Sequence, residues 1–184
     1  MRRRSLLLLV PVLVAAGLAL AGRSPAPEAR PLPPAKMERA DKRIDEAGAV
    51  QVTDGDTLRI GGSRIRLHGI DAPERAQSCD GADGQRYRCG EDAKAALTRL
   101  IGGHRPACVE RDRDRYGRSV AICSVAGRDL NRAMVAEGWA LAYTRYSRDY
   151  EGDEAAARRA RRGLWRGRFE RPDQYRAERR GRRG

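Results

Sequence analysis

Residues 54–57 place two carboxylates and a hydroxyl close together, where one strand-like stretch gives way to the next; they read Asp-Gly-Asp-Thr. Asp56 and Thr57 offer the oxygen ligands that a hard divalent cation prefers. By itself, however, an Asp-Gly pair is more typical of a tight turn than of a metal site. The segment is therefore a candidate cation site only in combination with other segments.

A second segment, residues 66–74, reads Arg-Leu-His-Gly-Ile-Asp-Ala-Pro-Glu. Arg66 leaves a strand-like stretch, Asp71 follows five residues later, and Glu74 comes three residues further on, after a turn that proline fixes. Alone, this pattern indicates a turn with surface ion pairs. His68 is interpreted as structural, because nothing else in the chain points to imidazole chemistry.

A third segment, residues 112–118, reads Asp-Arg-Asp-Arg-Tyr-Gly-Arg and separates two strand-like stretches. Alone, it indicates the solvated tip of a hairpin. Together the three segments are far more specific than any one of them, because their order and spacing form a single pattern.

Periodicity and turn signals predict the elements that must position these segments. A strand at 49–52 leads into the first segment, and residues 57–60 and 63–67 form a hairpin around a Gly-Gly turn. The paired residue numbers in this hairpin sum to 123, which places Thr57 opposite Arg66. Apolar residues at helical spacing, with glycine after each segment, predict three helices: 91–101, 131–137 and 150–162. We therefore expect an α+β fold, a small barrel capped by helices.

Length and charge indicate one domain with appendages. The chain has 184 residues and a formal net charge of +13, carried almost entirely by arginine, with only three lysines. Residues 48–157 hold seventeen basic and seventeen acidic residues, whereas residues 158–184 hold twelve arginines and three acids. So basic a chain usually meets an anionic partner such as nucleic acid, an acidic membrane surface or an acidic polysaccharide. A solvated, loose tail remains the plainer interpretation of the basic run.

The N-terminus has the pattern of an export signal. Three arginines at 2–4 precede an uncharged apolar run at 5–21 that ends Ala-Leu-Ala. An uncleaved membrane anchor is the alternative, because the run is close to the shortest length that spans a bilayer. The expected organisation is a signal peptide, a Pro-rich tether, a folded domain and a basic Arg-rich tail: 1–21, 22–47, 48–176 and 177–184.

The four cysteines of an exported chain predict two disulfides. A hairpin centred on the third segment pairs residues whose numbers sum to about 231, and Cys108 and Cys123 satisfy that sum. Cys79 and Cys89 then pair and close a Gly-rich loop. A zinc site is the rival interpretation, but the chain has neither a Cys-x-x-Cys motif nor a nearby pair of histidines.

The three segments, in this order and spacing, resemble the thermonuclease (staphylococcal nuclease-like) family, over roughly residues 50–176. The closing segment, residues 163–176, resembles the end of exported bacterial members. The resemblance implies a five-stranded OB-fold β-barrel with about three helices. It also implies hydrolysis of DNA and RNA that depends on calcium (Ca2+).

The family's functional positions transfer to this chain residue by residue. By resemblance, Arg66, Glu74 and Arg118 are catalytic: Glu74 activates water and the two arginines hold the phosphate. The calcium ligands implied are Asp56, Asp71, the carbonyl of Ala72 and, through water, Thr57. Many members have threonine at the position of Ala72. The residues matching the region that holds the terminal nucleotide are Arg115, Tyr116 and Tyr143, with Tyr146 a further candidate.

An alternative function is a non-catalytic OB-fold module that binds nucleic acid. The complete set of Arg66, Glu74 and Arg118 favours the enzyme. A third interpretation, an envelope protein whose basic tail binds acidic polymers, depends on the tail alone. We expect a secreted, periplasmic or cell-envelope monomer with DNA or RNA as substrate and no obligate protein partner, and with a membrane association only if the signal segment stays uncleaved.

Overall fold

The computed structural model describes residues 42–182. The predicted export signal and most of the predicted tether, through residue 41, lie outside the described residues. All the described elements belong to one compact unit. Over residues 42–182, none of the helices combines the length and the apolar character needed to cross a membrane.

The described residues contain eleven strands, four α-helices and one 3-10 helix. In chain order these are β1 (Lys42–Arg43), β2 (Val50–Asp54), β3 (Thr57–Ile60), β4 (Ser63–Leu67), β5 (Ile70–Asp71), β6 (Cys79–Asp80), β7 (Arg86–Tyr87), α1 (Cys89–Ile101), β8 (Ala107–Arg113), β9 (Ser119–Val125), β10 (Arg128–Asp129), α2 (Leu130–Ala136), β11 (Leu141–Ala142), α3 (Glu151–Arg159), the 3-10 helix η1 (Gly163–Arg166) and α4 (Pro172–Gly181). The fold is therefore α+β, as expected.

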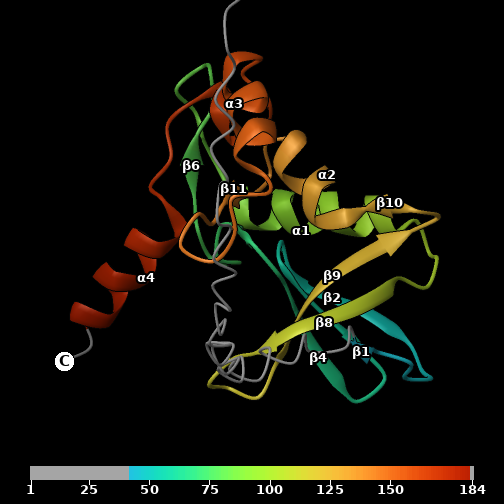
Figure 1. The fold of residues 1–184 in the computed structure, drawn as a ribbon. Helices are drawn as coiled ribbons and strands as arrows, with labels where there is room; N and C mark the ends of the chain where they lie inside the picture. Colours follow the sequence, from blue (N-terminus) through green and yellow to red (C-terminus); the bar gives the residue numbers. More distant parts are fainter. Residues whose placement is uncertain (1–41, 183–184) are drawn as a thin grey trace, which may run out of the picture. The chain divides into compact units, whose positions relative to one another are not determined.

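The main sheet has seven strands, in the order β1-β8-β9-β4-β3-β2, with β10 paired to β9 (Figure 1). Neighbouring strands are antiparallel except β4 and β9, which are parallel. Five strands have four residues or more, namely β2, β3, β4, β8 and β9, while β1 and β10 add only two residues each. The described sheet thus has more strands than the five-stranded barrel that was expected, and two of them are short. The pairings between described strands leave β1 and β2 as the ends of the sheet, and partial opening of this kind is usual in OB-fold barrels.

Both register predictions are confirmed. Thr57 lies opposite Arg66 in the β3–β4 hairpin. Cys108 lies opposite Cys123 in the β8–β9 hairpin, and the two form a disulfide with a Cα–Cα distance of 4.1 Å. Cys79 and Cys89 form the second disulfide. The predicted pairing of the four cysteines is therefore correct.

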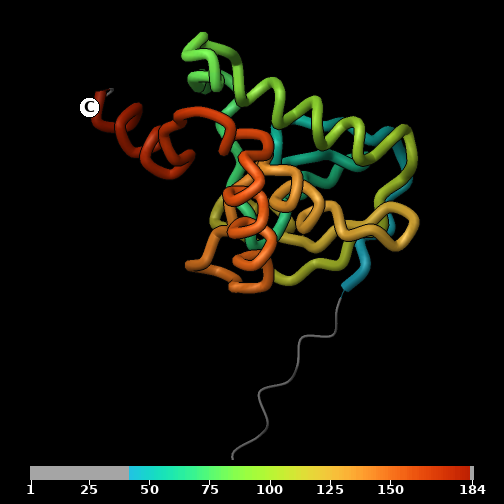
Figure 2. Tube along the Cα trace, turned by 90° about the horizontal axis from the view of Figure 1, so that it is seen from above, coloured from blue at the N-terminus to red at the C-terminus, as the bar shows by residue number. Residues whose placement is uncertain are grey.

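Helix α1 covers the sheet with its apolar face, and its position is visible in Figures 1 and 2. Ala93, Ala96, Leu97 and Ile101 are buried on this face and belong to the main core together with residues of β3, β4, β9 and α2. The helix ends at Gly102, whose backbone is left-handed with φ of 59°, a conformation that glycine adopts without steric cost.

Two parts of the chain extend the fold beyond the expected boundaries. The segment before Gly48 joins the sheet: β1 pairs with β8, and the backbone N–H of Ile44 donates to the carbonyl of Cys108 at 2.9 Å. After the three expected helices, α4 continues through residue 177, where the basic tail was expected to begin. Pro172 is the only residue of α4 that is fully buried, so no apolar stripe marked this helix in the sequence.

Candidate active site

The turn between β2 and β3 holds the carboxylate of Asp56 inside the protein, where it is 3% exposed. The hydroxyl of Thr57 donates to Oδ1 of Asp56 and the backbone N–H of Ala72 donates to Oδ2, both at 3.0 Å. Gly55 allows this close approach. A Cβ atom at Gly55 would lie 2.8 Å from the Cβ atoms of both Ala72 and Ala93.

Arg66 joins two of the predicted segments. From β4, its Nη1 donates to Oδ1 of Asp56 and its Nη2 donates to Oδ1 of Asp71, each at 2.8 Å. Asp71 lies in β5, opposite Leu141 of β11, and is also 3% exposed. One guanidinium therefore holds two buried carboxylates side by side through charge-assisted hydrogen bonds.

Glu74 lies on the turn after Pro73, and its side chain is 39% exposed. Gln77, which is buried, closes this turn: its backbone N–H donates to the carbonyl of Glu74 at 2.7 Å, and its side-chain oxygen accepts from the N–H of Glu74 at 3.2 Å. The first turn of α1 packs against the same carbonyl at Gly90. The backbone under Glu74 is thus supported from two sides.

Arg176 of α4 enters the cluster from the far end of the chain. Its Nη1 and Nη2 donate to the two carboxylate oxygens of Asp71, both at 2.9 Å, and Nη1 also donates to Glu74 at 3.0 Å. Burial lowers the pKa of Arg176, but hydrogen bonds and charges from Asp71 and Glu74 outweigh it and raise the pKa overall. The guanidinium therefore stays cationic.

The acids of the cluster repel one another. Burial, followed by the charge of Asp56, raises the pKa of Asp54 from the ordinary value of 3.8 to about 7. Burial also raises the pKa of Asp71; the hydrogen bond from Arg176 opposes this and the charge of Asp56 reinforces it. Burial and the charge of Asp56 thus both disfavour the ionised forms of Asp54 and Asp71, and a bound cation would offset this effect.

Arg118 immediately precedes β9, two residues before Val120, whose partner in β4 is Arg66. Its Nε donates to Oδ2 of Asp114 at 2.6 Å, and its backbone N–H donates to Oδ1 at 3.0 Å. In the structure the side chain of Arg118 is therefore paired with Asp114 rather than with Asp56 or Asp71.

The predicted nucleotide-binding residues form two aromatic groups. At the tip of the β8–β9 hairpin, Tyr116 is 63% exposed, and the guanidinium of Arg115 lies 4.9 Å from its ring centre. After β11, the rings of Tyr143 and Tyr146 lie 5.0 Å apart at 60°. Exposed rings next to arginine are suited to stacking with bases.

The donors near Asp56 and Asp71 fit a calcium ion in their chemistry. Two carboxylates, the carbonyl of Ala72 and the hydroxyl of Thr57 are all hard oxygen donors of the kind that calcium prefers. Within residues 42–182, no group of three or more His, Cys, Asp or Glu side chains forms a metal cage. Water would therefore have to supply much of the coordination shell.

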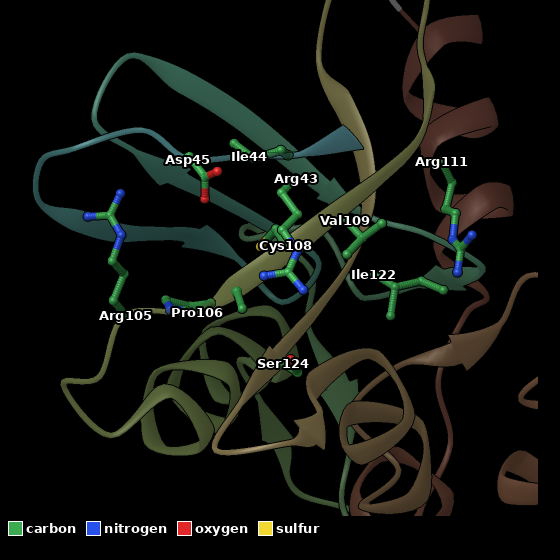
Figure 3. A pocket seen from close by; sticks show the side chains of 11 residues that line it. Arg43, Ile44, Asp45, Arg105, Pro106, Cys108, Val109, Arg111, Ile122 and Ser124 are labelled. Carbon is green, nitrogen blue, oxygen red and sulfur yellow. The ribbon is translucent and has the colours of Figure 1, made fainter. Parts of the chain in front are cut away.

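A cavity of about 400 Å³ lies elsewhere, on β1, β8 and β9 (Figure 3). Arg43, Arg105 and Arg111 line it together with apolar side chains such as Val109 and Ile122. None of the predicted catalytic or metal-binding residues lines this cavity, so it is separate from the candidate active site.

Sequence reasoning missed several supporting residues. Gln77 and Asn131 gave no signal, because a single buried amide resembles a surface one in sequence. Asn131 is fully buried and donates to the carbonyls of His68 and Ala121, which fixes the loop after β4 against β9. In the sequence, Arg176 is only the last residue of the segment that resembles the end of exported family members, and no local pattern links it to Asp71.

The fold and this cluster define an α+β, OB-fold-like protein with an Asp–Arg–Glu site. A profile of the family described as staphylococcal nuclease homologue matches residues 64–167. The chain therefore belongs to the staphylococcal nuclease homologue family, as its motifs indicated.

Curated relatives include the succinoglycan biosynthesis protein ExoI of Rhizobium meliloti (strain 1021), 38% identical over 122 residues, which are 65% of this chain and 64% of that protein. The probable staphylococcal-like nuclease CAN1 of Oryza sativa subsp. japonica is 34% identical over 71% of this chain and 38% of its own length. The micrococcal nuclease of Shigella flexneri is 32% identical over 63% of this chain and 71% of its own. The chain thus spans less than two thirds of the first two of these relatives.

Proposed function

We propose that this protein is a calcium-dependent nuclease that hydrolyses phosphodiester bonds in DNA, RNA or both. The observation that carries the proposal is the bridge of Arg66 between Asp56 and Asp71, with Glu74 attached to the same cluster through Arg176. These contacts support the proposal, in which the two aspartates are cation ligands, Arg66 binds phosphate and Glu74 is the base. The names of the rice and Shigella relatives support the same activity.

The residues have separate roles in this proposal. Asp56, Asp71, Thr57 and the carbonyl of Ala72 hold calcium, which supplies positive charge to the anionic phosphate when bound. Arg66 binds a non-bridging oxygen of the phosphate, where negative charge grows in the transition state. Because a phosphodiester is already anionic, cancelling its charge is the main requirement for attack by water.

Glu74 accepts a proton from the attacking water, whose oxygen forms a bond to phosphorus as the bond to the leaving oxygen breaks. The leaving oxygen takes a proton from solvent. Arg118 binds a second non-bridging oxygen, which requires its side chain to leave Asp114. Tyr116, Tyr143 and Arg115 hold the neighbouring nucleotide without reading its sequence.

We further propose that the chain is exported and acts outside the cytoplasm as a monomer. Two disulfides within the described residues support this, because disulfides persist in oxidising compartments.

The test is digestion of single-stranded DNA and of RNA by the purified chain, with calcium and then with chelator, beside Glu74→Gln. Cleavage that requires calcium and collapses in the variant supports the proposal. The competing function is a non-catalytic nucleic-acid-binding module. Tight binding to DNA without cleavage in any metal tested would favour that module and reject the nuclease.

A further inference from the structure

Helix α4 contacts the candidate active site with polar groups. Arg176 makes three hydrogen bonds to Asp71 and Glu74, and the hydroxyl of Tyr175 donates to the carbonyl of Ala76 at 3.3 Å. Just before the helix, Gln77 donates to the carbonyl of Glu170 at 2.7 Å. The helix therefore lies against the turn that carries Glu74.

The rest of α4 is weakly attached. Pro172 is its only fully buried residue, and from residue 177 onward its described side chains are exposed. Figure 2 shows the helix at the margin of the domain, next to the C-terminus. A helix held mainly by polar contacts to one loop loses little apolar burial when it detaches.

Arg176 engages the same oxygens that the proposed mechanism needs. Both carboxylate oxygens of Asp71 accept hydrogen bonds from it, and so does Oε1 of Glu74. A calcium ion coordinated by Asp71 must share the carboxylate with Arg176 or displace Arg176 from it, because a guanidinium and a divalent ion on the same carboxylate repel each other. A water activated by Glu74 meets the same competition.

We propose that Arg176 is a tethered cation that competes with calcium for Asp71 and Glu74, and that α4 is a C-terminal latch which calcium releases. This inference deepens, and rests on, the proposed calcium-dependent function. The latch is defined as α4, Pro172–Gly181. Linkage requires that whatever favours the docked latch weakens calcium binding, and that calcium loosens the latch by the same factor.

A support role for Arg176 predicts the opposite sign. If Arg176 only held Asp71 and Glu74 in place for the cation, removing it would weaken calcium binding. The direction of the change in affinity therefore distinguishes a competitor from a support.

The experiment compares Arg176→Gln with Arg179→Gln in the purified full chain. Arg179 lies one turn further along α4 and donates to the hydroxyl of Tyr175 at 2.9 Å. Replacing it by glutamine removes the same charge from the helix as Arg176→Gln does. Calcium affinity is measured by titration calorimetry without substrate. Arg176→Gln should bind calcium roughly tenfold more tightly than wild type, within the usual range of coupling between sites. Arg179→Gln should stay within about twofold of wild type, because surface charges contribute little.

Hydrogen exchange of the wild-type chain gives a second readout that does not depend on the variant folding. Backbone amides of α4 should exchange faster with calcium than with chelator, and those of α1 should not change. Unchanged exchange in α4 on saturation with calcium would overturn the latch, and so would equal or weaker calcium binding by Arg176→Gln.

The two proposals fail in different ways. Equal affinity of wild type and Arg176→Gln, with calcium-dependent cleavage intact, rejects the latch alone. If no variant binds calcium and the wild type does not cleave, both the proposed function and the latch are rejected.

Discussion

Gly90 lies so close to Glu74 that a Cβ atom at Gly90 would fall 1.9 Å from the carbonyl oxygen of Glu74. The atoms in the way belong to the backbone of the turn and cannot rotate aside. The first turn of α1 thus sets where the candidate base lies, and any larger residue at this position must push the turn away.

Gly90→Ala should therefore lower kcat by about a hundredfold, since a displacement of about 1 Å in a catalytic group costs that much. The measurement is the rate of calcium-dependent cleavage, with circular dichroism to confirm folding. Gly152→Ala in α3 is the matched control, because a Cβ atom there meets nothing within 4 Å. The control should retain activity and gain roughly 0.5–1 kcal/mol of stability. Full activity in Gly90→Ala would contradict this account of the turn.

Arg118→Gln should lower kcat by about a hundredfold to a thousandfold, the usual loss on removing one transition-state donor. Its melting temperature should change little, because the backbone N–H of residue 118 still donates a hydrogen bond to the carboxylate of Asp114. Arg113→Gln, in the same hairpin and paired with Glu110, is the control for a loss of positive charge. Equal losses in both variants would mean that Arg118 contributes only general charge.

Asp54→Asn should change how stability depends on pH in the absence of metal. The pKa of Asp54 is raised by burial and by Asp56 from 3.8 to about 7, so the folded state binds a proton that the unfolded state has released. The contribution of the raised pKa of Asp54 to the free energy of unfolding is complete below about pH 4 and is lost as the pH rises through 7. Wild type should therefore lose stability relative to Asp54→Asn across this window. Urea unfolding at successive pH values measures the difference; parallel curves would contradict the shifted pKa.

Removing the disulfide in the β8–β9 hairpin should destabilise the protein while leaving its architecture intact. Cys108 and Cys123 are 15 residues apart in sequence, and a loop of this size contributes about 3 kcal/mol in the chain-entropy account. Replacing both by alanine should lower the urea midpoint accordingly, with cleavage retained below it. A loss under about 1 kcal/mol would show that the hairpin already persists in the unfolded chain, so that the disulfide adds little further restraint.

The sequence by itself determined the local geometry of this protein. Turn residues set the hairpin registers that place Thr57 opposite Arg66 and Cys108 opposite Cys123, because a two-stranded pairing is fixed once its turn is located. Helix α1 followed from apolar residues at helical spacing and a terminal glycine. Asp56, Arg66 and Asp71 could be identified because short motifs carry them and the family resemblance combines those motifs.

Only the tertiary structure decided which distant groups meet at the site. Arg176 and Asp71 are 105 residues apart, and Gln77 and Glu170 are 93 apart, so no local pattern linked them. Helix α4 carries no apolar stripe, since its attachment is polar and depends on a partner surface that exists only after the rest of the chain has folded. The sequence could predict the acids of the candidate site. The contact of Arg176 with Asp71 and Glu74, by contrast, arises only when the chain folds.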